Sequence, residues 1–295
     1  MNNKTCYIIN FYLGERRKVP NSFKEDPLKF LKTQIFYLEK YSHSLNKIIF
    51  NFNMREQDYP FVSQIFNLTP KYIQGTEVEI NFRKNQGISY GAWSELYGKY
   101  KDFYDYFIFN EDDYFFTQNN WDKYLVEKYN SYPDCGYLCP FTREPHVWNS
   151  FKKHAGHSTG IASQENLKKI WDKYGQLPNN TQTDYISGQY TQVDFGFAFI
   201  EVGLNIYDIR DDYAVPFSWT EDDGRDIWRF WDWNPTNLII PALLTDGSPY
   251  VWFNSWDGEF LKEYNPTTHD EAIGCYNNKT KYHKLDTYIQ GPAPE

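Results

Sequence analysis

Hydrophobic residues are grouped in short runs along the first half of the chain. Residues 6–12, 47–52 and 105–109 are mostly apolar, and residues 77–82 alternate between charged or polar and apolar side chains. Runs of this length are typical of strands, and nearly continuous ones are typical of strands buried on both faces of a parallel sheet. The pattern therefore predicts four strands before residue 110.

Segments with helical spacing separate these predicted strands. The first one has apolar residues three and four positions apart, with lysine and glutamate opposite them, at Leu28, Leu31, Ile35 and Leu38 of segment 27–41. Segments 55–67, 93–100 and 121–130 give three more predicted helices, and Pro60 permits the first of these only near its start.

Strand and helix patterns that alternate with short connections predict an α/β fold with a mostly parallel, twisted sheet flanked by helices. Ligands bind such sheets at the carboxyl ends of the strands. The second half is less regular: we expect strands at residues 136–140 and 205–209 and a helix at 165–174 that ends at Gly175. After Pro216 the chain is rich in aromatic residues and shows no clear period.

Composition argues against several classes of protein. The 295 residues carry a formal net charge of −9, which disfavours nucleic acid as a partner. No apolar run approaches the roughly 18 residues of a membrane span, and the first residues lack the pattern of a signal peptide. The four cysteines form no CxxC pair, which disfavours a zinc site. We expect a soluble, cytoplasmic protein.

Three acidic residues follow the fourth apolar run directly: Glu111, Asp112 and Asp113. Buried charges must be paired or must bind a metal ion. Three carboxylates provide oxygen ligands in a number that suits Mg²⁺ or Mn²⁺, and these ions also bind substrate phosphates. One interpretation is a metal that bridges the protein to a diphosphate, and the other is a solvated acidic turn.

The motif and its surroundings resemble the GT-A glycosyltransferases. Residues 107–113 are similar to the strand and acidic motif of that family, and residues 83–92, Arg-x-Asn-x-Gly-x-Ser-x-Gly-Ala, are similar to a segment beside the nucleotide sugar. Residues 6–14 resemble the first strand and the loop that receives the base. The resemblance covers about residues 5–210. It implies a single GT-A-like, Rossmann-like domain, with a nucleotide-sugar half at about 1–130 and an acceptor half and tail at about 131–295.

The resemblance also implies roles for individual residues. Asp113 would bind Mn²⁺ or Mg²⁺ together with Glu111, and a C-terminal histidine, His283 or His269, could add a ligand. The residues expected to bind the nucleotide sugar are Tyr12, Gly14, Arg16, Arg83, Asn85, Gly87, Glu111 and Asp112.

The implied reaction transfers a sugar from a nucleoside-diphosphate sugar to an acceptor hydroxyl, which we expect to belong to a glycan. An inverting enzyme needs a base for the acceptor proton. The usual Glu-Asp pair of the family is not intact, because Gln192 occupies the aspartate position. Asp194 is our first candidate and Asp184 the second, although Asp194 as a helix-start residue is an equal alternative. The departure leaves inverting and retaining chemistry open.

Other functions remain compatible with the sequence. A sugar nucleotidyltransferase would have a glycine-rich phosphate loop directly after the first strand, where only Gly14 occurs. A non-catalytic carbohydrate-binding protein with aromatic platforms would bind no nucleotide through a metal. Sugar transfer onto modified DNA is disfavoured by the acidic charge.

Overall fold

The computed structural model describes residues 3–14, 26–112, 114–116, 119–139, 142–143, 154–155, 159–179, 185–208 and 239–241. The helices are α2 (Lys29–Lys40), a 3-10 helix η1 (Glu56–Phe61), α3 (Val62–Leu68), α4 (Ile88–Tyr100), α5 (Trp121–Asn130), α6 (Gln164–Tyr174) and α7 (Tyr185–Glu201). The strands are β1 (Thr5–Phe11), β2 (Lys47–Met54), β3 (Tyr72–Ile73), β4 (Thr76–Lys84), β5 (Tyr106–Glu111), β6 (Tyr114–Phe116), β7 (Cys135–Cys139), β8 (Thr142–Arg143), β9 (His154–Ala155), β10 (Gly160–Ser163), β11 (Asn205–Asp208) and β12 (Ile239–Pro241).

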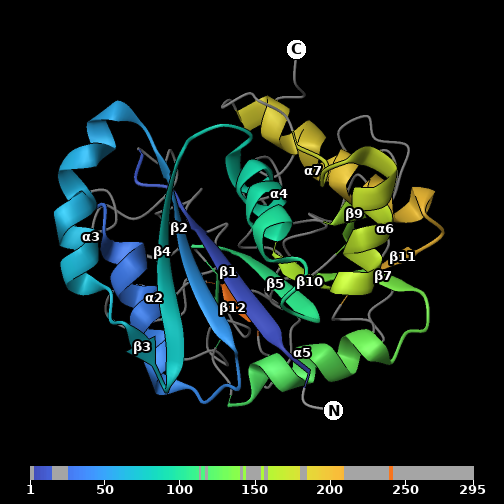
Figure 1. Cartoon of the computed structure of the whole chain (residues 1–295), viewed down its shortest axis with the longest axis horizontal. Coiled ribbons are helices and arrows are strands. Elements are labelled where there is room, and N and C mark those ends of the chain that lie inside the picture. The colour runs from blue at the N-terminus through green and yellow to red at the C-terminus, as the bar shows by residue number, and fades with distance from the viewer. Residues whose placement is uncertain are drawn as a thin grey trace, which may run out of the picture.

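One eight-stranded sheet organises these elements (Figure 1). Its strand order is β11-β7-β10-β5-β1-β2-β4-β3. The pairs β5-β1, β1-β2, β2-β4 and β7-β11 are parallel, whereas β10 is antiparallel to both β5 and β7. The predicted α/β class is confirmed, with a mostly parallel sheet flanked by helices.

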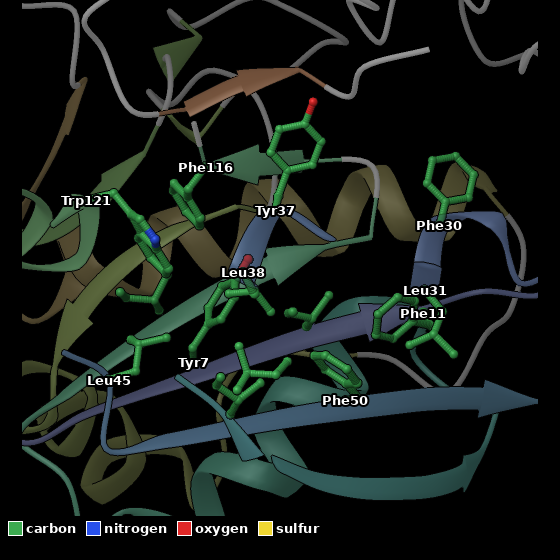
Figure 2. Packing of buried hydrophobic residues seen from close by; sticks show 14 of the residues in the cluster. Tyr7, Phe11, Phe30, Leu31, Tyr37, Leu38, Leu45, Phe50, Phe116 and Trp121 are labelled. Atoms are coloured by element: carbon green, nitrogen blue, oxygen red, sulfur yellow. The ribbon is translucent and has the colours of Figure 1, made fainter. Parts of the chain in front are cut away.

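Helices cover both faces of the sheet and create two hydrophobic cores. One core lies between the sheet and helices α2 and α5, where Figure 2 shows Tyr7 and Phe11 of β1 facing Leu31 and Leu38 of α2. Trp121 closes one end of this core, and its ring stacks on Phe116 with centroids 3.8 Å apart. The second core lies under α4, α6 and α7.

We call the core beneath α2 and α5 the α2 core, and the core beneath α4, α6 and α7 the α4 core. Side chains alternate between these two cores along a strand. Tyr7, Ile9 and Phe11 belong to the α2 core, whereas Cys6 and Ile8 belong to the α4 core. Both faces of β1 are therefore buried, as its nearly continuous apolar run predicts.

Most predicted elements are confirmed, and the segment 55–67 needs a correction. It is not one helix but the 3-10 helix η1, which contains Pro60, followed by α3. Proline lacks a backbone N–H and crowds the preceding turn, so an α-helix cannot run through it without distortion. The predicted helix at 165–174 is confirmed: Ser163 accepts a hydrogen bond from the N–H of Asn166 at its start, and Gly175 ends it with φ +74°.

Two further features position the candidate site. Helix α4 begins five residues earlier than its hydrophobic pattern predicts, directly after Gly87 in the left-handed conformation (φ 69°). Strand β10 is antiparallel, so its first residue, Gly160, lies opposite Phe109 near the carboxyl end of β5. In the part of the chain that the structure describes, no helix has the length and apolar character needed to cross a bilayer.

Candidate active site at the carboxyl edge of the sheet

Glu111 and Asp112 lie where the parallel strands β1, β2, β4 and β5 end. Glu111 is the last residue of β5, the strand that pairs with β1, and it lies opposite Asn10. The carboxyl ends of parallel strands share one edge of a sheet, and this edge is where such folds bind ligands. The structure therefore brings Glu111 and Asp112 to the predicted edge.

Asp112 connects the end of β5 to the end of β1. Its side chain is buried, and its Oδ2 accepts a hydrogen bond from the backbone N–H of Tyr12 at 3.0 Å. The N–H of Asp112 donates to the carbonyl of Asn10 at 3.2 Å, and its carbonyl accepts from Gln34 Nε2 at 3.0 Å. Three hydrogen bonds thus hold Asp112, and its side chain fixes the position of the backbone at Tyr12, directly after β1.

Glu111 faces the beginning of α4. Its Oε1 accepts a hydrogen bond from Ser89 Oγ at 2.8 Å, and its backbone N–H donates to Thr159 Oγ1 at 3.3 Å. Thr159 is fully buried, and it also donates to Asn110 Oδ1 at 3.1 Å. The antiparallel direction of β10 is the reason that Thr159, which precedes this strand, reaches the carboxyl edge of β5.

A row of asparagines crosses the sheet beside Glu111. Asn10, Asn51 and Asn81 lie opposite one another on β1, β2 and β4. Asn81 Nδ2 donates to Asn51 Oδ1 at 2.7 Å, and Asn51 Nδ2 donates to Asn10 Oδ1 at 2.6 Å. Asn10 Nδ2 donates in turn to Ser89 Oγ at 3.1 Å. This row links β4, three strands away from β5, to Glu111.

Tyr12 forms an aromatic surface at the end of β1. The guanidinium carbon of Arg55 lies 5.0 Å from the centre of the Tyr12 ring, and two hydrogen bonds to Asp58 hold that guanidinium in place, at 2.7 and 2.9 Å. Gly14 passes so close to the ring that a Cβ there would lie 2.2 Å from ring atoms. Any larger residue at position 14 would therefore require the Tyr12 side chain to move.

Arg83 and Asn85 lie at the end of β4, two strands beyond β1. Arg83 donates to Glu95 Oε2 at 2.9 Å and to Asn53 Oδ1 at 2.8 Å. The N–H of Asn85 donates to the carbonyl of Met54 at 3.0 Å. These contacts hold the turn that leads into α4, and the charge of Arg83 is paired with Glu95.

Asp194 lies on α7, and its side chain is exposed. The neighbouring Phe195 is buried in the α4 core, where its ring lies 5.2 Å from Tyr90 and 6.4 Å from Phe109. Helix α7 therefore packs on the face of the sheet that Glu111 faces. Asp194 as the base remains a prediction.

Two buried tyrosines near the site stay protonated. Burial raises the pKa of Tyr7 well above its usual value, and a hydrogen bond from Asn110 opposes this only in part. Burial also raises the pKa of Tyr137, and nearby groups that include the Glu111 carboxylate add to the shift. Neither phenol can supply a negative charge at neutral pH.

Five predicted site residues lie outside the described residues: Arg16, Asp113, Asp184, His269 and His283. The sequence pattern did not single out Asn10, Asn51, Asn81 or Thr159, and Ser89 stood in the segment 83–92 without a predicted role. A signal for the asparagines existed, because each one lies between apolar residues in a predicted strand, as Ile-Asn-Phe, Phe-Asn-Phe and Ile-Asn-Phe.

The carboxylate oxygens at this edge are compatible with a divalent ion that prefers oxygen ligands. Among the residues that the structure describes, no three His, Cys, Asp or Glu side chains form a metal-binding cluster. Mg²⁺ commonly needs only one or two protein carboxylates, because water and substrate phosphates complete its shell. Glu111, with Asp113 two residues later in the sequence, could supply that number.

Comparisons with known proteins give weak similarities. No protein-family model and no curated protein matches the chain. Among solved structures, CMP:2-keto-3-deoxy-manno-octonic acid synthetase complexed with CTP is similar with a TM-score of 0.41 and 13% identity, covering 70% of this chain and 89% of that one. The 4-diphosphocytidyl-2C-methyl-D-erythritol synthase of Anaerococcus prevotii DSM 20548 is similar with a TM-score of 0.40 and 10% identity, covering 70% and 86%. At this level of similarity, a functional proposal for the chain rests on its own site.

Proposed function

We propose that the chain is a glycosyltransferase that moves a sugar from a nucleoside-diphosphate sugar to an acceptor hydroxyl with Mn²⁺ or Mg²⁺. The observation that carries the proposal is the position of Glu111 and Asp112 at the carboxyl end of β5, next to β1. Both carboxylates are oriented by hydrogen bonds, from Ser89 and from the Tyr12 amide.

The beginning of α4 favours an anionic ligand at this edge. The N-terminus of a helix carries partial positive charge and is stabilised by nearby negative groups. Ser89 in the first turn of α4 already binds the Glu111 carboxylate. A diphosphate bound beside Glu111 would add negative charge, and a divalent ion held by Glu111 and Asp113 would neutralise the charge that develops on the leaving group.

The residues of the chain have separate tasks in this proposal. Asp112 holds the backbone of Tyr12, and the Arg55 guanidinium packs against the Tyr12 ring. The ring thus offers a fixed surface on which a nucleotide base can stack. Arg83 keeps the turn before α4 in place through Glu95 and Asn53. Asp194 on α7 is the proposed acceptor of the proton that the attacking hydroxyl loses.

Calorimetry with a panel of nucleoside diphosphates, each with and without Mn²⁺, tests the proposal. We expect at least one diphosphate to bind only with Mn²⁺, and Asp113→Ala to abolish that binding. Asp102→Ala is the matched control, because Asp102 is an exposed aspartate in the connection between α4 and β5 and pairs only locally with Lys101.

Two results would contradict the proposal. One is equal diphosphate binding by the parent and by Asp113→Ala. The other is pyrophosphate release from a nucleoside triphosphate and a sugar phosphate, which would identify a sugar nucleotidyltransferase.

A further inference from the structure

Four side-chain hydrogen bonds form a row beside the candidate site, and these four run in one direction. Asn81 donates to Asn51, Asn51 to Asn10, Asn10 to Ser89 and Ser89 to Glu111. Their lengths are 2.7, 2.6, 3.1 and 2.8 Å. The series starts at an amide of β4 and ends on a carboxylate of β5. Each group in such a series polarises the next one, so the last donor is strengthened.

This row of polar side chains occupies a place that packing alone would fill with apolar ones. Asn10 and Asn51 are buried, and Ile8 and Ile49, two residues earlier on the same strands, belong to the α4 core. Burying an amide is costly unless its hydrogen bonds are made. Among the described residues, the buried asparagines of the sheet lie near its carboxyl edge, where Glu111 lies.

Ser89 joins the row to Glu111. A serine hydroxyl has one proton, and this proton rotates to suit its neighbours. Asn10 Nδ2 donates to Ser89 Oγ, so this oxygen serves Asn10 as an acceptor and its proton remains available for Glu111 Oε1. Ser89 is itself buried in the first turn of α4, which limits the positions that its hydroxyl can take.

We propose that Ser89 is a positioning residue that, with Asn10 and Asn51 behind it, holds the Glu111 carboxylate in the orientation that receives the divalent ion. The inference rests on the proposed function, because it assigns a task to Ser89 within that site. Groups that orient a metal ligand commonly change metal affinity about 10- to 100-fold when they are removed.

Binding of Mn²⁺ alone tests the inference, with free Mn²⁺ measured by electron paramagnetic resonance on the full chain. We expect Ser89→Ala to weaken Mn²⁺ binding about 10- to 100-fold, and Ser89→Thr, which keeps a hydroxyl, to recover at least part of the loss. Ser94→Ala is the matched control. Ser94 is also a buried serine of α4, but its Oγ accepts from the N–H of Leu177.

The outcomes separate this inference from the proposed function. Weaker Mn²⁺ binding by Ser89→Ala, unchanged binding by Ser94→Ala and recovery by Ser89→Thr would support it. Equal losses in Ser89→Ala and Ser94→Ala, or no recovery by Ser89→Thr, would overturn it. If Glu111→Gln loses Mn²⁺ binding while Ser89→Ala retains it, only this inference fails. If neither Glu111→Gln nor Asp113→Ala alters Mn²⁺ binding, the proposed function fails as well.

Discussion

The Asp112 carboxylate accepts a hydrogen bond from the backbone N–H of Tyr12, although 100 residues separate the two in the chain. This contact joins the ends of β5 and β1 at the edge where the candidate site lies. An acidic residue of the motif thus has a structural task, which is to fix the start of the segment that follows β1.

The first prediction concerns this contact. Asp112→Ala removes this acceptor from the amide of Tyr12, which lies at a half-buried position. We expect a loss of about 1–3 kcal/mol in the free energy of unfolding, measured with urea. Asp112→Asn keeps an acceptor oxygen and should lose less. Equal stability of Asp112→Ala and the parent would show that the contact contributes nothing.

The second prediction concerns the Tyr12 ring. If a base stacks on it, Tyr12→Ala should weaken binding of the nucleoside diphosphate by about 1–3 kcal/mol, whereas Tyr12→Phe keeps the ring and should bind nearly as well. Calorimetry measures both. Tyr72→Ala is the control, because Tyr72 is exposed on β3, beside the first residues of β4. Unchanged binding by Tyr12→Ala would remove this residue from the site.

The third prediction concerns Gly91 in α4. Alanine usually stabilises a helix relative to glycine, but a Cβ at position 91 would lie 2.2 Å from the carbonyl oxygen of Gln86 and 3.2 Å from Nη2 of Arg83. Backbone cannot give way as a side chain can, so Gly91→Ala should destabilise the protein by about 1–3 kcal/mol.

The control for Gly91 is another glycine of the same helix. At Gly98 a Cβ would meet the edge of the Trp171 ring at 2.6 Å, and this half-buried side chain can move. Thermal unfolding of both variants should therefore show a larger loss for Gly91→Ala than for Gly98→Ala. The reverse order would contradict the assigned backbone contact.

The fourth prediction concerns pH. Burial lowers the pKa of His43, and the attraction of Asp122 and the backbone of Leu38 oppose the shift only in part. Below the usual pKa of about 6.5, the unfolded chain binds a proton at His43 that the folded chain does not. Stability contributed by neutral His43 is therefore complete above about pH 6.5 and is lost as the pH falls toward the lowered folded-state value.

Urea unfolding at a series of pH values measures this effect. The parent should lose more stability on acidification below about pH 6.5 than His43→Gln, which cannot titrate at that position. All other ionisable groups are common to the two proteins, so the difference between their pH profiles reports His43 together with its attraction to Asp122. An equal loss in both would show that His43 does not titrate differently on folding.

Local sequence patterns were sufficient to predict the architecture near the acidic motif. Nearly continuous apolar runs predicted β1, β2 and β5, because strands buried on both faces need apolar side chains on both. The alternation of strands and helices then placed Glu111 at the carboxyl edge. Both predictions depend on residues that are close in sequence, which is where hydrophobic periodicity carries information.

Sequence patterns did not predict that β10 is antiparallel to β5 or that Arg83 pairs with Glu95. The direction of β10 depends on its pairing with Phe109 and its neighbours, about 50 residues earlier in the chain. The charge of Arg83 suggested a ligand, but the fold pairs it with Glu95 of α4. Its predicted place in the nucleotide-sugar site remains a prediction.

The sequence by itself determined strands β1, β2, β4, β5, β7 and β11, most helices and the edge at which Glu111 and Asp112 lie, since each follows from the spacing of nearby residues. Only the tertiary structure decided which side chains meet there. Asn10 lies 41 residues from Asn51 and 79 from Ser89, and these contacts exist only after the strands are aligned in register. Register depends on the packing of whole faces against helices, and no single segment contains that information.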